Sequence, residues 1–204
     1  MALIGEVVVG ETPLTAEDLQ GLKLPLVKTR AQLNLVEGAN IVAAKEWAMK
    51  SRVARMPNML TIQFLQTLHR RMLGDVWEWA GEIRTTELQN EFAAPLANIR
   101  PDLLNLYKDT AEHWLNDKLM SADEFAARVH HRIVKIHPFR NGNGRHSRLL
   151  ADLILERHFG RPPFTWGGNA NLGTDDAHRP AYLVALKAAD QGNYAALLQL
   201  CRAA

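Results

Sequence analysis

The sequence predicts an all-α protein, a helical bundle with one short β-hairpin laid on it. Three observations support this prediction. Apolar residues recur at helical spacing through most of the 204 residues. Only one segment, residues 81–99, leans toward β structure. No internal repeat, low-complexity tract or linker marks a second independent domain, so the helices are expected to share one core.

The helices can be placed from their apolar periodicity and their end signals. Ser121 and Glu124 form a capping-box pattern, which marks a helix start. Pro101 suits the first turn of a helix, and Gly74 suits a position just past the end of one. The expected helices cover residues 29–52, 61–74, 101–115, 121–136, 144–159, 175–190 and 194–202.

Two segments interrupt this pattern. In residues 81–99, Ile83, Thr85 and Thr86 favour strand, and a polar turn follows them, so a short hairpin or flap is expected there. Residues 162–173 are rich in Gly, Pro and Asn and are expected to form a loop. The first 28 residues carry few periodic apolar positions and are expected to form an arm.

Composition narrows the class of protein. Apolar residues make up 47% and charged residues 23%, which is typical of a soluble globular protein with a sizeable core. The formal net charge of +2 demands neither a nucleic-acid nor an anionic-membrane partner. The single cysteine, Cys201, excludes an internal disulfide and fits a reducing compartment. No signal segment or membrane-spanning run is apparent, so a cytoplasmic location is expected.

Chemistry-bearing residues concentrate in "HPFRNGNGR", between two predicted helices. Pro138 disfavours helical torsions at His137, so this imidazole is expected at a helix end. Gly142 and Gly144 can adopt positive φ, which lets consecutive backbone N–H groups form a nest for an anion. The next helix adds the positive end of its dipole to the same spot.

Arg145 and Arg148 lie three residues apart at the start of that helix, so both can reach the nest. Guanidinium groups on such a nest favour a polyphosphate ligand. His137 beside it could accept a proton from an attacking hydroxyl, which indicates phosphoryl or nucleotidyl transfer. The less favoured alternative is a structural zinc site without an HExxH or CxxC motif, using His130, His131, His137 and His146.

The stretch "HPFRNGNGRHSR" resembles the Fic motif, HxFx[D/E]GNGRxxR, at every fixed position except residue 141. The resemblance covers about residues 58–200, because residues 68–84 and 179–193 are also similar to Fic segments. Detail around the motif is most similar to the Fic-type group called mobile mystery protein B. The resemblance implies a Fic fold, with a β-hairpin flap beside the active-site loop. It divides the chain into an N-terminal arm with an inhibitory helix (1–57) and a Fic domain (58–204).

The resemblance also implies a reaction, the transfer of AMP from ATP to a Ser, Thr or Tyr hydroxyl of a target protein with Mg²⁺. His137 would be the general base, and Phe139 would anchor the loop. Arg145 would hold the distal phosphates and Arg148 the γ-phosphate. An anion hole is implied for three adjacent residues, Gly142, Asn143 and Gly144.

The implied partners follow from the same resemblance. The flap, residues 83–99, would clamp a target segment by strand addition. Members of the closest group also suggest a DNA-binding regulator as a partner, in a toxin-like pair. Neither a membrane nor a direct nucleic-acid contact is expected.

Asn141 departs from the Fic pattern, because it stands at the acidic position that coordinates Mg²⁺. A neutral amide oxygen is a weaker ligand for this hard cation than a carboxylate. Three outcomes remain open at this position: slow adenylylation, a different phosphate-containing donor or reaction, or loss of activity. In the last two cases the chain would be a nucleotide-binding regulator or toxin-like protein.

Glu37 and Gly38 match the end of the Fic inhibitory motif, [S/T]xxxE[G/N], although Leu33 replaces its Ser or Thr. The motif implies that Glu37 pairs with Arg148 and occupies the place of an ATP phosphate. A bidentate carboxylate suits a guanidinium group in this way. Self-inhibition through Glu37 is therefore expected.

Overall fold

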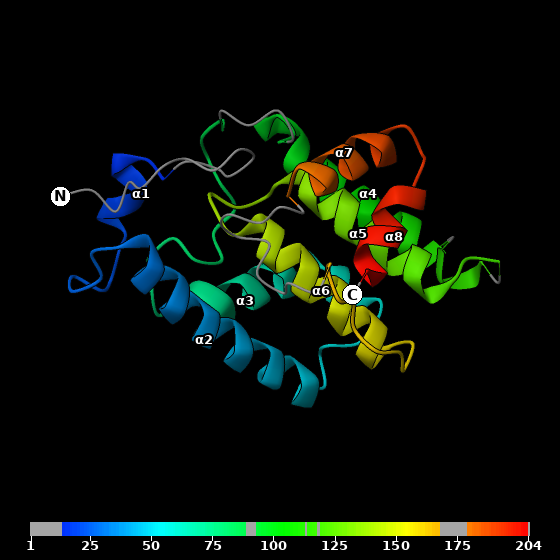
Figure 1. Cartoon of the computed structure of the whole chain (residues 1–204), viewed down its shortest axis with the longest axis horizontal. Coiled ribbons are helices and arrows are strands. Elements are labelled where there is room, and N and C mark those ends of the chain that lie inside the picture. The colour runs from blue at the N-terminus through cyan, green and yellow to red at the C-terminus, as the bar shows by residue number, and fades with distance from the viewer. Residues whose placement is uncertain (1–13, 89–92, 113, 118, 168–178, 204) are drawn as a thin grey trace.

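The computed structural model describes residues 14–88, 93–112, 114–117, 119–167 and 179–203 (Figure 1). The described residues are mainly helical and carry no extended sheet, which confirms the all-α prediction. The α-helices are α1 (Ala16–Gln20), α2 (Arg30–Lys50), α3 (Ile62–Leu73), α4 (Leu96–Glu112), α5 (Ala122–Ile136), α6 (Asn143–Arg157), α7 (Arg179–Asp190) and α8 (Ala195–Arg202). Two 3₁₀ turns, η1 (Asn58–Leu60) and η2 (Trp114–Asn116), precede α3 and follow α4.

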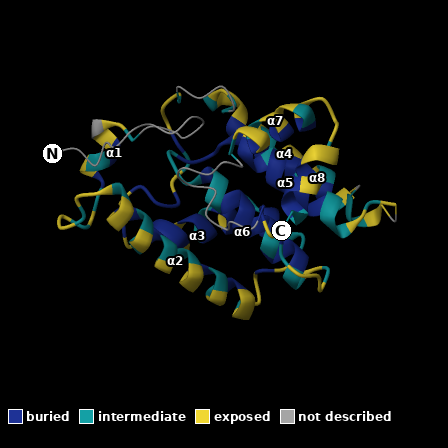
Figure 2. Ribbon diagram, viewed as in Figure 1, coloured by how far each residue is buried: buried dark blue, intermediate teal, exposed yellow. Residues whose placement is uncertain are grey.

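Helices α5 and α6 form the centre of the molecule (Figure 1). Helices α2 and α3 pack together on one side of α6, and α4, α7 and α8 lie on the side of α5. Most residues of both central helices are buried (Figure 2). The apolar side chains of α3, α5 and α6 meet in a single core, which includes the fully buried Leu68, Ile133 and Leu150. The loop between α5 and α6 is therefore held at both ends by helices of the packed core.

Helix starts follow the capping signals in the sequence. The side chains of Thr29, Thr61 and Ser121 each accept a hydrogen bond from a first-turn backbone N–H of α2, α3 and α5. The arm also contains a short helix that the sequence analysis missed, α1, which begins with a capping box between Thr15 and Asp18.

The prediction that Pro101 starts a helix was wrong. Helix α4 begins five residues earlier, at Leu96, and Pro101 lies inside it. The Leu96 backbone N–H donates to the Glu87 carboxylate at 3.0 Å, and Asn98 N–H donates to the Pro95 carbonyl at 2.9 Å. These two bonds satisfy donors of the first turn, and the missing Pro101 N–H costs the helix only one bond near its start.

The hairpin predicted over residues 81–99 is not seen in the described part of this segment. The described residues of this segment, 81–88 and 93–99, form an isolated antiparallel bridge between Ile83 and Phe139 and then the first turn of α4. The predicted polar turn falls partly on residues 89–92, which lie outside the described residues. Ile83 therefore pairs with the loop after α5 and not with residues 96–99, because those residues form the first turn of α4.

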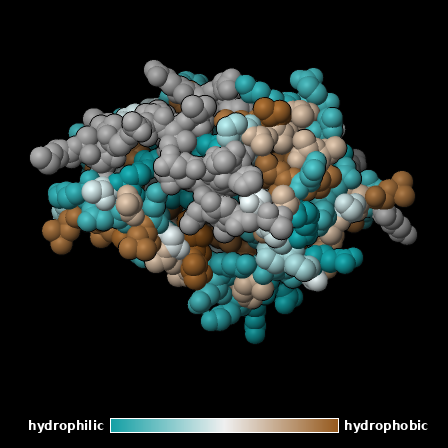
Figure 3. Space-filling view, viewed as in Figure 1, coloured by the Kyte–Doolittle hydropathy of each residue, from teal (hydrophilic) through white to brown (hydrophobic). Residues whose placement is uncertain are grey.

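The exposed face of α2 carries several large apolar side chains, and apolar groups are visible along this edge of the molecule (Figure 3). Leu35, Val42 and Met49 are spaced by seven residues and are 76%, 61% and 36% exposed. Among the described helices, none combines the length and the hydropathy that crossing a membrane requires.

Candidate active site

His137 lies where α5 ends, as Pro138 predicted. Its backbone adopts the left-handed conformation, with φ 51°, and its N–H donates to the Ile133 carbonyl at 2.9 Å to close the helix. A non-glycine residue in this conformation is strained and is held in place by its surroundings. The turn therefore ends α5 at His137 and places this residue in the loop that leads into α6.

The tautomer of His137 follows from its hydrogen bond. Nδ1 lies 3.1 Å from the Val134 carbonyl oxygen, which can only accept, so Nδ1 carries the proton. Nε2 is then the nitrogen with the lone pair. Burial lowers the pKa of His137 to about 4, against an opposing effect of the Val134 bond. The side chain is therefore a neutral base at neutral pH.

The glycines of the loop differ in conformation. Gly142 has φ 77°, and a Cβ there would lie 2.7 Å from the Leu73 side chain, so the turn requires glycine. The prediction of positive φ at Gly144 was wrong, because Gly144 is the second residue of α6 and is helical. A Cβ at Gly144 would lie 3.6 Å from the Arg148 guanidinium. The nest is thus one left-handed glycine followed by the first turn of α6, whose N–H groups have no intrahelical acceptor.

Asn143 locks the loop with both ends of its amide. Its Oδ1 accepts from the Phe139 N–H at 2.9 Å, and its Nδ2 donates to the Phe139 carbonyl at 2.7 Å. Asn143 is 2% exposed, so neither bond is shared with solvent. The side chain thus shapes the nest, and the contribution of Asn143 to an anion hole is left to its backbone N–H.

Asn143→Asp is expected to lower the free energy of unfolding by roughly 1–3 kcal/mol, because a carboxylate cannot donate to the Phe139 carbonyl and leaves it unsatisfied. Denaturant unfolding followed by circular dichroism measures the change. Asn98→Asp is the matched control, since Asn98 is exposed in the first turn of α4. Equal stabilities of the two variants would contradict the locking role.

Asn141 turns its side chain onto the nest. Its Oδ1 accepts from the Gly142 N–H at 2.6 Å and lies 3.5 Å from Arg145 Nη2. Mg²⁺ in phosphate sites usually takes one or two carboxylates plus substrate phosphates. Within the described part of the chain, no group of three His, Cys, Asp or Glu side chains could hold a metal. Asn141 thus offers one neutral oxygen that is already engaged, and this donor set does not fit a resident Mg²⁺ ion.

Arg148 brings a buried positive charge to the start of α6. It is 6% exposed, and burial lowers its pKa from the ordinary arginine value. Among the described residues no carboxylate forms an ion pair with Arg148, although the charge of Asp152 on the same helix raises its pKa against the effect of burial. Its neighbour is the Tyr182 hydroxyl, which in turn lies 2.9 Å from His130 Nε2. A buried guanidinium without an anion is costly, so this position favours an anionic ligand.

Arg145 is the arginine that pairs with Glu37. Its Nη1 forms an ion pair with Glu37 Oε2, whereas the resemblance implied that Glu37 pairs with Arg148. Glu37 is 2% exposed, and its other oxygen accepts from Trp77 Nε1 at 2.7 Å. The reason for the difference is the register of α2 against α6, which sets Glu37 opposite the more exposed of the two arginines.

Arg140, which no predicted role covered, pairs with the arm. Its Nη1 lies 2.9 Å from Glu17 Oε1 and 3.6 Å from Asp18 Oδ1, both in α1. The arm thus contacts the loop directly. The pairing has no local sequence signal, because the partners are 123 residues apart.

Arg84 is a second functional position that the sequence analysis missed. Its buried guanidinium donates to the His137 carbonyl at 2.8 Å, to the Thr86 carbonyl at 3.1 Å and to the Ala94 carbonyl. Its backbone N–H donates to the Pro138 carbonyl at 2.9 Å. Arg84 therefore ties both limbs of the 81–95 segment to the loop that carries His137.

The structure does not gather the four histidines of the zinc alternative. His130 bonds to Tyr182, and His131 bonds to Tyr194 and Asp190. His146 Nε2 lies 3.1 Å from the Leu65 carbonyl. Each ring has a separate protein partner, as expected of packed core histidines.

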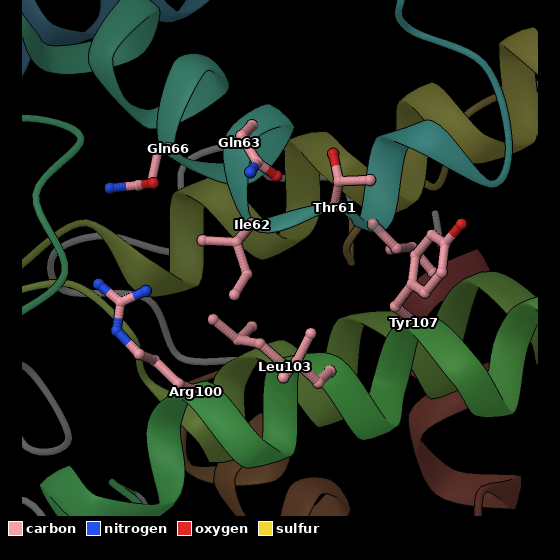
Figure 4. Close-up of a pocket in the computed structure, with 9 residues that line it drawn as sticks. Thr61, Ile62, Gln63, Gln66, Arg100, Leu103 and Tyr107 are labelled. Carbon is pink, nitrogen blue, oxygen red and sulfur yellow. The ribbon is translucent and has the colours of Figure 1, made fainter.

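A cavity of about 290 Å³ lies between the start of α3 and the face of α4 (Figure 4). Ile62 and Leu103 face one another across it, Arg100 points toward Gln66 at one end, and Tyr107 lies at the other (Figure 4). None of the predicted site residues lines this cavity. The predicted site is instead the loop and helix start at residues 137–148.

Known proteins resemble this chain over most of its length. It is 32% identical over 190 residues to a protein adenylyltransferase Fic from Culex quinquefasciatus, covering 86% of this chain and 36% of the relative. It is 34% identical over 163 residues to protein adenylyltransferase fic-1 from Caenorhabditis elegans, covering 71% of this chain and 31% of the relative. The chain thus spans about a third of the length of these curated relatives.

Solved structures agree with this similarity. Residues 134–508 of C. elegans Fic-1 match with a TM-score of 0.63 and 26% identity, over 87% of this chain and 49% of that one. The Bartonella tribocorum effector BepC, solved with AMPPNP, matches with a TM-score of 0.61 and 21% identity, over 85% and 86%. The second match shows the shared fold alone. Residues 59–155 match the Fic/DOC family, and this chain therefore carries a Fic/DOC family domain.

Proposed function

We propose that this chain is a protein adenylyltransferase, which transfers AMP from ATP to a Ser, Thr or Tyr hydroxyl of a target protein in the cytoplasm. The observation that carries the proposal is a neutral His137 in the loop that leads into the positive start of α6, together with Arg148 on that helix, which is buried and has no ion-paired carboxylate among the described residues. The similarity to adenylyltransferases supports the same activity.

In this reaction the target hydroxyl oxygen attacks the α-phosphorus of ATP, and the bond from that phosphorus to the β-phosphate bridging oxygen breaks. Pyrophosphate leaves, and the hydroxyl proton passes to Nε2 of His137. The first-turn N–H groups of α6, with Arg145 and Arg148, neutralise the phosphate charge. Mg²⁺ enters with ATP as part of the substrate, since the described residues do not build a site for it.

Glu37 is proposed to restrain this reaction. A phosphate that binds Arg145 must displace the Glu37 carboxylate, because both groups compete for the same guanidinium N–H donors. Displacement also breaks the bond from Trp77 Nε1. The resting enzyme would therefore bind ATP weakly.

The target is proposed to dock along residues 83–88, which run beside the loop that carries His137. Two observations support this position. Ile83 already forms an antiparallel bridge with Phe139, so the segment is extended there, and Arg84 holds it in place. An extended segment of this kind suits strand addition by a target peptide. A DNA-binding regulator as a further partner is proposed on family resemblance alone.

Incubation with Mg²⁺ and ATP labelled at the α-phosphate is expected to label the chain or a target protein, and γ-labelled ATP is expected to give no label. Asn141→Asp is expected to lower the Mg²⁺ concentration that gives half-maximal labelling, because a carboxylate binds this cation better than an amide. Gln191→Glu is a control that also adds one carboxylate, because Gln191 is exposed after α7 and lies outside the loop.

Two outcomes would contradict the proposal. Label from the γ-phosphate would indicate phosphoryl transfer. ATP binding without label in both the wild type and Asn141→Asp would favour the nucleotide-binding regulator.

A further inference from the structure

His69 of α3 lies between two segments of the site that are far apart in the sequence. Its Nδ1 accepts a hydrogen bond from the Gly81 backbone N–H at 2.8 Å. Its Nε2 lies 3.0 Å from the carbonyl oxygen of Asn141. The side chain is fully buried, so protein groups alone decide its state. One ring thus contacts the loop that carries the nest and the segment that leads to Arg84.

The two partners fix the tautomer. A backbone N–H can only donate, so Nδ1 holds the lone pair, and a carbonyl can only accept, so Nε2 carries the proton. If the ring were protonated, Nδ1 would also carry a proton, and this N–H would face the Gly81 N–H with no acceptor between the two donors. Burial and the nearby His146 lower the pKa of His69 well below its ordinary value, which agrees with a permanently neutral ring.

The His69 ring is stacked on one aromatic side chain and approached closely by the backbone of two glycines. It stacks on Phe139 with ring centroids 3.9 Å apart and planes at 20°. A Cβ on Gly142 would lie 3.3 Å from its Nε2, and a Cβ on Gly81 would lie 2.8 Å from the Gln66 carbonyl of the same helix. Both glycines therefore allow the backbone to approach α3 closely at the two ends of the ring.

We propose that His69 is a positioning residue, which sets the separation between the nucleotide-binding loop and the target-docking segment through one imidazole ring. It does not touch the reacting atoms and acts through Asn141 and Gly81. The inference rests on the proposed adenylyltransferase function for its kinetic consequences, whereas the geometry of the two bonds can be tested without any activity.

Two substitutions separate the two bonds. His69→Asn places an amide near the position of Nδ1 and can still accept from Gly81, but it does not reach the Asn141 carbonyl. His69→Gln places an amide near the position of Nε2 and can still donate to Asn141, but it does not reach Gly81. The two variants remove similar amounts of buried ring, so a difference between them reports the bonds themselves.

In the full chain, His69→Asn is expected to weaken ATP binding and to lower kcat by about 10²-fold. The reason is that loss of the Asn141 bond lets the nest shift, and a displacement of about 1 Å in a catalytic site can slow a reaction by about this factor. His69→Gln is expected to keep ATP affinity near that of the wild type and to raise the KM for the target. The amide NMR signal of Gly142 should shift most in His69→Asn, and that of Gly81 most in His69→Gln.

His131→Gln is the matched control, because His131 is also buried and bonded to two groups, Asp190 and Tyr194, that lie outside the site. It should lower the melting temperature and leave ATP affinity and kcat unchanged. Equal ATP affinities and equal amide shifts in His69→Asn and His69→Gln would overturn the inference. Absence of label in the wild type would overturn the proposed function, and the NMR shifts would still decide the role of His69.

Discussion

His137→Ala is expected to abolish AMP transfer while ATP binding is retained. A positioned general base contributes roughly 10²–10⁴-fold to rate, so labelling should fall at least to that extent. ATP binding depends on α6 and its arginines, which the substitution leaves in place. Labelling with α-phosphate-labelled ATP measures the first quantity, and calorimetric titration with ATP measures the second.

The same residue predicts the pH dependence. A general base works only when deprotonated, and burial lowers the pKa of His137 to about 4. Activity should therefore persist as pH falls through 6.5, the ordinary histidine value, and should be lost only as pH approaches 4. The rate of labelling is measured between pH 4 and pH 8 on samples that remain folded by circular dichroism.

His158→Ala is the control for this experiment, because His158 lies at the opposite end of α6. It should leave labelling and the pH profile unchanged. Full activity of His137→Ala, or an activity loss centred near pH 6.5 in the wild type, would show that another group accepts the proton.

Glu37→Gln is expected to raise the affinity for ATP by about tenfold or more, and to raise the labelling rate with it. A gain of about 1.4 kcal/mol in binding corresponds to tenfold in the dissociation constant. The substitution removes the carboxylate charge from Arg145, whereas the amide oxygen can still accept from Trp77. Arg145 is then left without its anion until a phosphate supplies one.

The same change should destabilise the protein without nucleotide. A charged group that loses its hydrogen-bonding partner in a partly buried site costs roughly 1–3 kcal/mol. Added ATP should recover this stability, and the gain in melting temperature on ATP addition should be larger in Glu37→Gln than in the wild type. Differential scanning calorimetry with and without ATP measures both effects.

Glu46→Gln provides the control on the same helix, because Glu46 is exposed on α2. It changes the net charge equally and should leave ATP affinity unchanged. An unchanged ATP affinity in Glu37→Gln would show that the Glu37–Arg145 pair is only structural.

Local patterns account for much of what the sequence analysis predicted correctly. Helix caps such as Ser121 depend on residues three positions apart, and the turn at His137 depends on the adjacent Pro138. The requirement for glycine at residue 142 is likewise visible in the motif. The error at the start of α4 arose because Glu87, which lies outside the helix, accepts a hydrogen bond from the first N–H of α4.

Tertiary packing decided the contacts between distant segments. His69 meets Asn141 across 72 positions, and Arg84 meets His137 across 53, with no periodicity to connect them. Tertiary packing also decided that Glu37 pairs with Arg145 and not with Arg148, since this pairing depends on the register of two packed helices.

The sequence by itself determined the helical fold, the loop at residues 137–148 and the family, because these depend on short-range periodicity, capping and a contiguous motif. Only the tertiary structure decided which nitrogen of His137 holds the lone pair, which arginine Glu37 neutralises, and which buried groups hold the loop. Those features depend on the distance and direction between groups that the chain brings together only when its core is packed.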